Sequence, residues 1–209
     1  MESASVFPML NVGSSTHKFR TVTQPWIDQY VFKPIREGGH VVQHLDIKDA
    51  PGVDIVGDLT ESGFLEELSR MEFRSVLCAS LLEHVHNREE ICRALVSVIP
   101  VGGHVFVSCP HKYPYHADPI DTMFRPDLDE LAALFPQTRV VDGEILTCGT
   151  YLDSVTRSFS MLVRTVARIF LPVYRPRGWL TTVSHLPWLL RHYQIACLVL
   201  RKCAEDETC

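Results

Sequence analysis

The sequence lacks the features that mark several large classes of protein. It contains no run of about 18 uncharged apolar residues, so an ordinary membrane-spanning helix is not expected. Its first residues, MESASVFPML, have neither a basic start nor a long apolar stretch, which argues against a secretory signal. The formal net charge is −5, so no general field attracts nucleic acid. We therefore expect a cytoplasmic protein that does not bind nucleic acid.

Paired cysteines and a glycine-rich dinucleotide motif are absent as well. Seven cysteines are scattered along the chain without a Cys-x-x-Cys pair, so neither a disulfide framework nor a zinc cluster is expected. The Gly-x-Gly-x-x-Gly fingerprint is missing, which weakens the case for a dehydrogenase that uses a nicotinamide cofactor.

The middle of the chain contains a strand–helix–strand unit. Two short apolar runs, Ser75–Ala79 and His104–Cys109, predict buried strands. The segment 88–99 between them has apolar residues at helical spacing, and Pro100 with the glycine pair after it ends this helix. Such a unit is typical of a parallel sheet. At 209 residues and 46% hydrophobic composition, the chain is long enough for one α/β domain over residues 1–209.

This unit carries two short motifs, LLEHV at 81–85 and PVGG at 100–103. They resemble the region after the fourth strand of class I S-adenosylmethionine (SAM)-dependent methyltransferases, and the resemblance covers roughly residues 7–145. It implies a doubly wound, mostly parallel seven-stranded sheet whose last strand is antiparallel. It also implies SAM as cofactor and methyl transfer to a small-molecule acceptor, with O-methylation favoured. Two alternatives remain: a methyltransferase-like domain that has lost tight SAM binding and catalysis, and a peripheral membrane or interaction protein that acts through residues 148–191.

Six residues at the ends of predicted strands are the candidates for cofactor binding. They are Gly13, Ser14, Asp46, Asp58, Leu59 and Ser80. Gly13 follows the predicted strand 6–12, and a turn of small residues there lets the backbone approach a ligand closely. Serines replace the later glycines of the family motif at positions 14 and 15, so an ordinary turn is the alternative.

Two aspartates follow the next predicted strands. Asp46 follows strand 41–45, where a carboxylate can accept hydrogen bonds from both ribose hydroxyls of a nucleoside; a turn or helix-capping role is the alternative. The resemblance implies that Asp58, after strand 53–56, accepts a hydrogen bond from the adenine amino group while Leu59 packs on the ring. Asp58 could instead cap a predicted helix over 61–69. Ser80 lies where the fourth strand ends, near the expected cofactor.

The segment after the fifth strand, HKYPYHADPIDTMFRPDLDEL, is the candidate acceptor site. It resembles an H-x-D-P-x-D-x-x-x-R-P loop of bacterial methyltransferases in sugar or natural-product pathways. Prolines stiffen the loop, and a stiff loop with histidines and a carboxylate suits general-base catalysis. We predict His116 or His111 as the base, with Asp121 beside it. Arg125 either binds an acidic group of the acceptor or pairs with an aspartate of the loop.

Glu83 and His84 also have side chains that bind metal ions. Some ubiquinone-type O-methyltransferases have an additional Glu before such a Glu-His pair, and this chain has Ser80 in that neighbourhood. We therefore assign Glu83 and His84 to the start of the following helix and predict no metal.

Strands are predicted at 139–146 and 192–200, separated by a helical insertion at 148–191. Within the insertion, residues 154–171 predict one amphipathic helix with Arg157, Arg164 and Arg168 along a stripe. A basic amphipathic helix of this kind suits a lid over the acceptor, a homodimer face or a peripheral membrane contact through 154–190.

The segment between Gly13 and the second strand is longer than this fold needs. A helix is predicted over 25–37, kinked or ended at Pro34. The basic stretch 17–20 before it forms either a flap over the cofactor or a solvated loop.

Overall fold

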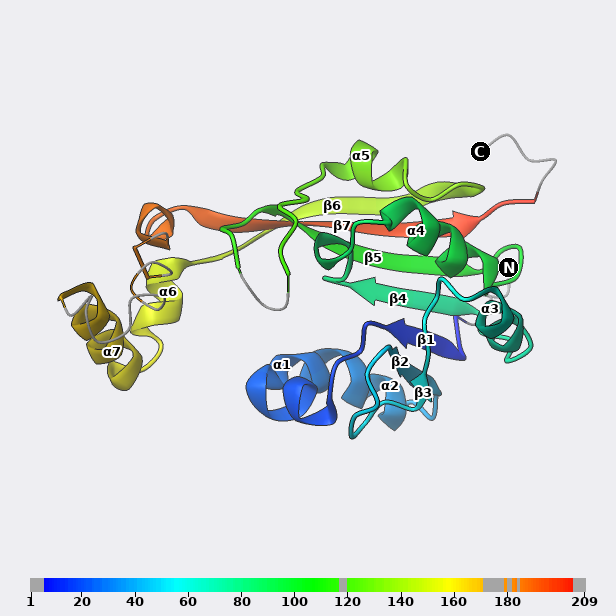
Figure 1. The fold of residues 1–209 in the computed structure, drawn as a ribbon, viewed down its shortest axis with the longest axis horizontal. Helices are drawn as coiled ribbons and strands as arrows, with labels where there is room; N and C mark the ends of the chain where they lie inside the picture. Colours follow the sequence, from blue (N-terminus) through cyan, green and yellow to red (C-terminus); the bar gives the residue numbers. More distant parts are fainter. Residues whose placement is uncertain (1–5, 117–119, 171–178, 180–181, 184, 205–209) are drawn as a thin grey trace.

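The computed structural model describes residues 6–116, 120–170, 179, 182–183 and 185–204. These residues form a seven-stranded sheet in the order β3-β2-β1-β4-β5-β7-β6 (Figure 1). The strands are β1 (Met9–Val12), β2 (Val42–Asp46), β3 (Ile55–Val56), β4 (Ser75–Ala79), β5 (His104–Lys112), β6 (Thr138–Thr150) and β7 (His192–Lys202). β7 is antiparallel to both β5 and β6, and the other neighbouring pairs are parallel. The predicted doubly wound sheet with an antiparallel last strand is therefore confirmed.

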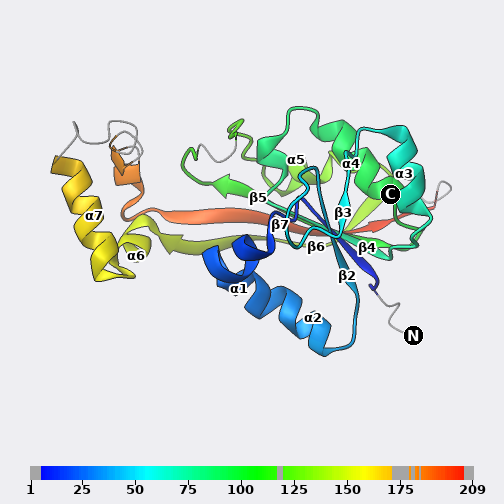
Figure 2. The same cartoon turned by 60° about the horizontal axis from the view of Figure 1, so that its bottom comes forward.

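Helices cover both faces of the sheet, as Figure 2 shows. One layer contains α3 (Ser62–Ser69), α4 (Arg88–Ser97) and α5 (Leu128–Ala132), and the other contains α1 (Pro25–Ile27) and α2 (Lys33–Glu37). The central strands lie between these layers, so Leu10 of β1 and Val76 of β4 are fully buried. The predicted apolar face of α4 packs into the same core through Ile91 and Leu95.

The predicted N-terminal helix is present, but it adapts to its proline instead of ending there. A π-helical turn, η2 (Asp28–Phe32), separates α1 from α2, and the Lys33 N–H donates to the Asp28 carbonyl. Pro34 then lies in the first turn of α2. A residue in that turn needs no intrahelical donor, so the missing proline N–H costs little there.

The predicted single helix over 154–171 is wrong, because the chain forms α6 (Tyr151–Thr156) and α7 (Phe159–Phe170) instead. Thr150 and Asp153 make a reciprocal capping box at the start of α6. A second helix then starts after Ser158, whose carbonyl accepts the N–H groups of Met161 and Leu162. Two helix starts this close together exclude one continuous helix.

The break separates Arg157 from the other two arginines of the predicted stripe. Arg157 precedes α7 and lies over the ring of Trp26, 5.3 Å from its centroid. Arg164 and Arg168 are exposed on α7. In both views α6 and α7 lie beyond the ends of β6 and β7, outside the layers that cover the sheet (Figures 1 and 2). No helix among the described residues is long and apolar enough to cross a membrane.

The cysteines behave mostly as core residues. Cys78 and Cys109 are fully buried, as their strand patterns predicted, and Cys197 is half-buried with a free thiol. Cys203 differs because it is disulfide-bonded. The scattered positions of the cysteines had predicted no disulfide framework.

Candidate cofactor and acceptor site

The turn after β1 requires the glycine found there. Gly13 has φ +67°, and a Cβ at this position would lie 3.0 Å from Cδ1 of Leu81. A side chain would therefore be strained by both the backbone conformation and the contact. This contact also brings the turn after β1 against the segment that follows β4, where Ser80 lies.

Asp46 ties the same turn to the end of β2. Its carboxylate accepts the N–H of Ser15 at 2.8 Å and the N–H of Lys48 at 3.1 Å. The buried Ser14 N–H donates to the Leu45 carbonyl at 3.0 Å. Each carboxylate oxygen of Asp46 has a second lone pair, so these bonds leave acceptor capacity toward a ligand hydroxyl. The turn-forming role of Asp46 is thus observed, and its ribose contact stays a prediction.

Asp58 and Leu59 follow β3 beside Asp46. The Gly57 N–H donates to the Asp46 carbonyl at 3.2 Å, which places the two loops side by side. One oxygen of Asp58 accepts both the N–H and the hydroxyl of Thr60. Leu59 is only 5% exposed and belongs to the core. Their contacts with adenine stay predictions.

Ser80 occupies a left-handed turn, with φ +51°, directly after β4. Its N–H donates to the Ser108 carbonyl of β5 at 3.0 Å, and its side chain is exposed. All six predicted cofactor residues therefore lie at or just beyond the carboxyl ends of four adjacent strands. Ligands of open α/β sheets bind at this edge.

Arg20 is a residue of this edge that the sequence did not reveal. It is 4% exposed, and its guanidinium donates to the carbonyls of Ser14 and Ser15 at 2.7 Å and of Gly52 at 2.6 Å. Burial lowers the pKa of Arg20, and the nearby Asp54 opposes that shift. Arg20 therefore fastens the turn after β1 to the loop between β2 and β3. This role differs from both the flap and the solvated loop predicted for this stretch.

The predicted acceptor loop is held by a buried ion pair. Arg125 donates to both carboxylate oxygens of Asp121, at 2.6 and 3.1 Å, and the Asp121 side chain is fully buried. The N–H groups of His116 and Met123 also donate to Asp121. Burial alone would raise the pKa of Asp121, but these hydrogen bonds outweigh it and lower that pKa to about 2. The pairing of Arg125 with an aspartate is thus the alternative that the structure supports.

The two predicted bases have different surroundings. Nδ1 of His111 lies 2.8 Å from the Pro126 carbonyl, so it carries the proton of that hydrogen bond. The ring of His116 meets the ring of His84 edge to face, with centroids 5.2 Å apart. The structure therefore brings His116, Asp121 and Arg125 together, and it adds His84 to them.

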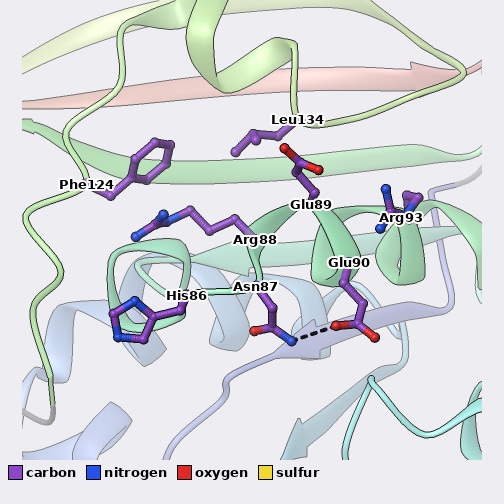
Figure 3. A pocket seen from close by; sticks show the side chains of 8 residues that line it. All are labelled: His86, Asn87, Arg88, Glu89, Glu90, Arg93, Phe124 and Leu134. Carbon is purple, nitrogen blue, oxygen red and sulfur yellow. Dashed lines mark hydrogen bonds between the residues drawn. The ribbon is translucent and has the colours of Figure 1, made fainter.

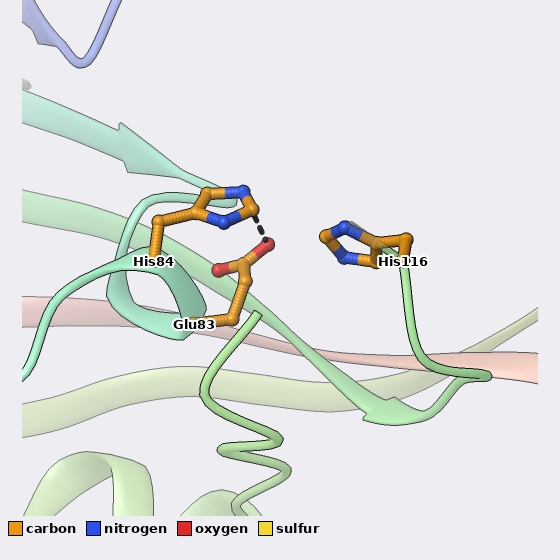
Figure 4. Close-up of side chains that lie close together, drawn as sticks. All are labelled: Glu83, His84 and His116. Atoms are coloured by element: carbon orange, nitrogen blue, oxygen red, sulfur yellow. Dashed lines mark ion pairs between the residues drawn. The ribbon is translucent and has the colours of Figure 1, made fainter. Parts of the chain in front are cut away.

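Glu83, which the sequence assigned to a helix start, lies in the same group (Figure 4). That assignment is wrong, because α4 begins at Arg88 and Glu83 belongs to the separate short 3-10 helix η3 (Leu82–His84). Glu83 is 1% exposed. Burial raises the pKa of its carboxyl group, and its own backbone N–H and the neighbouring His84 oppose the shift. The thiol of Cys109 donates to Oε2 of Glu83 at 3.9 Å.

Aromatic rings extend from this group toward the insertion. Tyr113 lies 5.7 Å from His116 and 4.7 Å from Tyr193, and Trp188 lies 5.8 Å from Tyr193, measured between ring centroids. Trp188 belongs to η4 (Leu186–Trp188) of the insertion. The region around His116 therefore combines polar groups with aromatic rings.

A shallow hollow of about 330 Å³ lies at the start of α4. Figure 3 shows its lining, in which Arg88 stacks on Phe124 at 4.3 Å and Asn87 donates to Glu90 at 2.9 Å. A second hollow includes His40 and Phe73 in its lining. Neither hollow is lined by a predicted site residue, so neither is assigned to cofactor or acceptor.

Comparison with known proteins gives structural matches alone. No protein-family model matches the chain, and no curated protein sequence matches it. The [4+2]-cyclase SpnF is 17% identical with a TM-score of 0.55, and the match covers 94% of this chain and 74% of that one. Coclaurine N-methyltransferase, bound to N-methylheliamine and SAH, is 14% identical with a TM-score of 0.53, covering 93% and 65%.

A third match is a SAM-dependent methyltransferase from Archaeoglobus fulgidus, 15% identical with a TM-score of 0.52, covering 93% of this chain and 85% of that one. At these identities the likeness concerns the fold. The predicted resemblance is confirmed at that level: the chain has the seven-stranded α/β fold of class I SAM-dependent methyltransferases.

Proposed function

We propose that this protein binds SAM at the carboxyl edge of β1, β2, β3 and β4 and transfers its methyl group to a small-molecule acceptor. The main support is the turn Gly13–Ser15, which has a glycine with positive φ and is fastened to the Asp46 carboxylate. A narrow turn suits the methionine chain of SAM, and a carboxylate beside it suits the ribose hydroxyls.

An oxygen acceptor is the favoured one. The sulfonium of SAM makes its methyl group electrophilic, and the protein must hold the acceptor oxygen in line behind it. As the O–CH₃ bond forms, the S–CH₃ bond breaks and the sulfonium becomes a neutral thioether. The acceptor proton leaves to a base, for which His116 is the leading candidate and His111 the second. The aromatic rings of Tyr113 and Tyr193 would pack on the acceptor body.

The cofactor part of the proposal is tested by calorimetric titration with SAM and with S-adenosylhomocysteine. We expect wild type to bind both at micromolar concentrations. Asp46→Ala removes the carboxylate and also releases the Ser15 N–H, so binding should become undetectable. Asp49→Ala is the matched control, since Asp49 is exposed, lies three residues away and removes the same charge.

The result that rejects the proposal is a folded wild-type protein that binds neither compound. Equal losses in both aspartate variants would show that net charge, and not the Asp46 site, carries binding. Once SAM binding is established, His116→Ala tests the base: methyl transfer near the wild-type rate, with SAM still bound, would remove His116 from that role.

A further inference from the structure

Glu83, His84 and His116 form a group of three metal-binding side chains. Each offers one ligand atom, and these atoms all lie within 4.8 Å of one another. Figure 4 shows the two rings and the carboxyl group directed toward a common point from two segments, η3 and the loop after β5. Two histidines and a carboxylate are a ligand set found in zinc and non-haem iron sites.

The hydrogen bonds around the group orient its ligand atoms. Nδ1 of His84 bonds the Ile120 carbonyl, which can only accept, so Nδ1 carries the proton. In the neutral ring Nε2 then presents its lone pair, and it lies 3.8 Å from Oε1 of Glu83. Histidines that bind metals usually donate their other N–H to a carbonyl in this way. The Cys109 thiol likewise occupies Oε2 of Glu83 and leaves Oε1 facing the ring.

The spacing suits a cation and not a direct hydrogen bond. A distance of 3.8 Å between Nε2 and Oε1 exceeds hydrogen-bond length. Two ligands about 2.1 Å from a tetrahedral zinc ion lie about 3.4 Å apart. Closure by a few tenths of an ångström would therefore bring both atoms into coordination. His116 must move further: its side chain is 26% exposed, and its Nε2 now lies 3.9 Å from Oδ2 of Asp121.

We propose that Glu83, His84 and His116 bind a divalent transition-metal ion, with Zn²⁺ as the reference ion. Three protein ligands leave an open coordination position, as in catalytic zinc sites. A buried carboxylate is costly unless it is paired or metal-bound, so the ion would also neutralise Glu83.

The open position would accept the acceptor oxygen, a role that rests on the proposed function, whereas ion binding does not. Coordination lowers the pKa of the acceptor hydroxyl, its proton passes to solvent, and the oxygen then takes the methyl group while the S–CH₃ bond breaks. With the ion bound, the lone pair of His116 is used for coordination, and the ion replaces this histidine as the activator of the acceptor.

The test is calorimetric titration of the full chain with Zn²⁺ after treatment with a chelator. Wild type should bind one equivalent, and His116→Ala and Glu83→Gln should each weaken binding at least tenfold. His86→Ala is the matched control, because His86 is exposed and lies two residues from His84. Its affinity should equal that of wild type. Circular dichroism checks that each variant is folded. If Glu83→Gln does not fold, the result for His116→Ala decides the test.

Cobalt substitution separates this site from the free cysteines of the chain. A cobalt spectrum without a thiolate charge-transfer band agrees with oxygen and nitrogen ligands. Absence of Zn²⁺ binding to wild type overturns the proposal, as does binding that is unchanged in His116→Ala or that shows thiolate ligation. A protein that binds Zn²⁺ at this site but not SAM would keep the metal site and reject the proposed function.

Discussion

Replacing Arg20 by alanine should destabilise the protein and weaken SAM binding together, because one guanidinium fastens the turn after β1. It makes three hydrogen bonds of 2.6–2.7 Å to backbone carbonyls. A hydrogen bond from a charged donor contributes roughly 1.5–3 kcal/mol, so the three would give about 4.5–9 kcal/mol if they were additive. Desolvation of the guanidinium offsets part of this, and water reaches the exposed Gly52 in the variant. We expect a net loss of about 3 kcal/mol.

The assay is urea unfolding followed by circular dichroism, alongside SAM titration of each folded variant. Arg70→Ala is the control: the Arg70 side chain is 77% exposed and makes an ion pair of 3.8 Å with Glu66, one helical turn away. Surface pairs of this kind contribute about 0.5 kcal/mol or less. An Arg20→Ala protein that loses no more stability than Arg70→Ala would refute the role assigned to Arg20.

Three further outcomes follow from the described contacts. Gly13→Ala should lose about 1–2 kcal/mol from its positive φ and lose SAM affinity, whereas Gly63→Ala, with open space in α3, should be neutral or stabilising in thermal denaturation. Burial, and then the charge of Arg20, lower the pKa of His44 to about 4, below its unfolded value of 6.5. Folding therefore favours the neutral ring, and stability should fall as the pH falls from 6.5 to 4, by about 1–2 kcal/mol because solvent screens this partly exposed ring. A urea midpoint of wild type that does not fall, or one that falls equally in His44→Gln, would contradict this. The pKa of Asp121, about 2, lies below its unfolded value of 3.8, so folding favours the ionised carboxylate. The ion pair with Arg125 therefore stabilises the protein above pH 4, and this contribution of about 2 kcal/mol should disappear as the pH falls from 4 to 2. In an acid titration of stability, Asp121→Asn should abolish that part of the loss.

The local pattern of the sequence predicted the strands one by one, and the resemblance to class I methyltransferases supplied their arrangement in one sheet. Apolar runs such as Ser75–Ala79 form strands because they are short, are partly made of β-branched residues and are bounded by turn residues. Since parallel strands end at one edge, the residues after them, including Gly13 and Asp46, had to lie near one another. The length of helix in the insertion was not predictable in the same way, because Thr150 and Ser158 each start a helix within a continuous amphipathic pattern.

Contacts between segments distant in the chain were decided by the tertiary structure alone. The sequence placed Arg20 in either a flap or a solvated loop. Its hydrogen bond to the carbonyl of Gly52, 32 residues later, forms only when the chain returns to that point in the fold. The group of Glu83, His84 and His116 is likewise formed when the loop after β5 returns over η3. Hydrophobic periodicity specifies which face of an element is buried, and it therefore predicted single strands and helices such as α4 together with their buried faces. It carries no information about which polar side chains of different loops meet, and that pairing was settled by the packing of the fold.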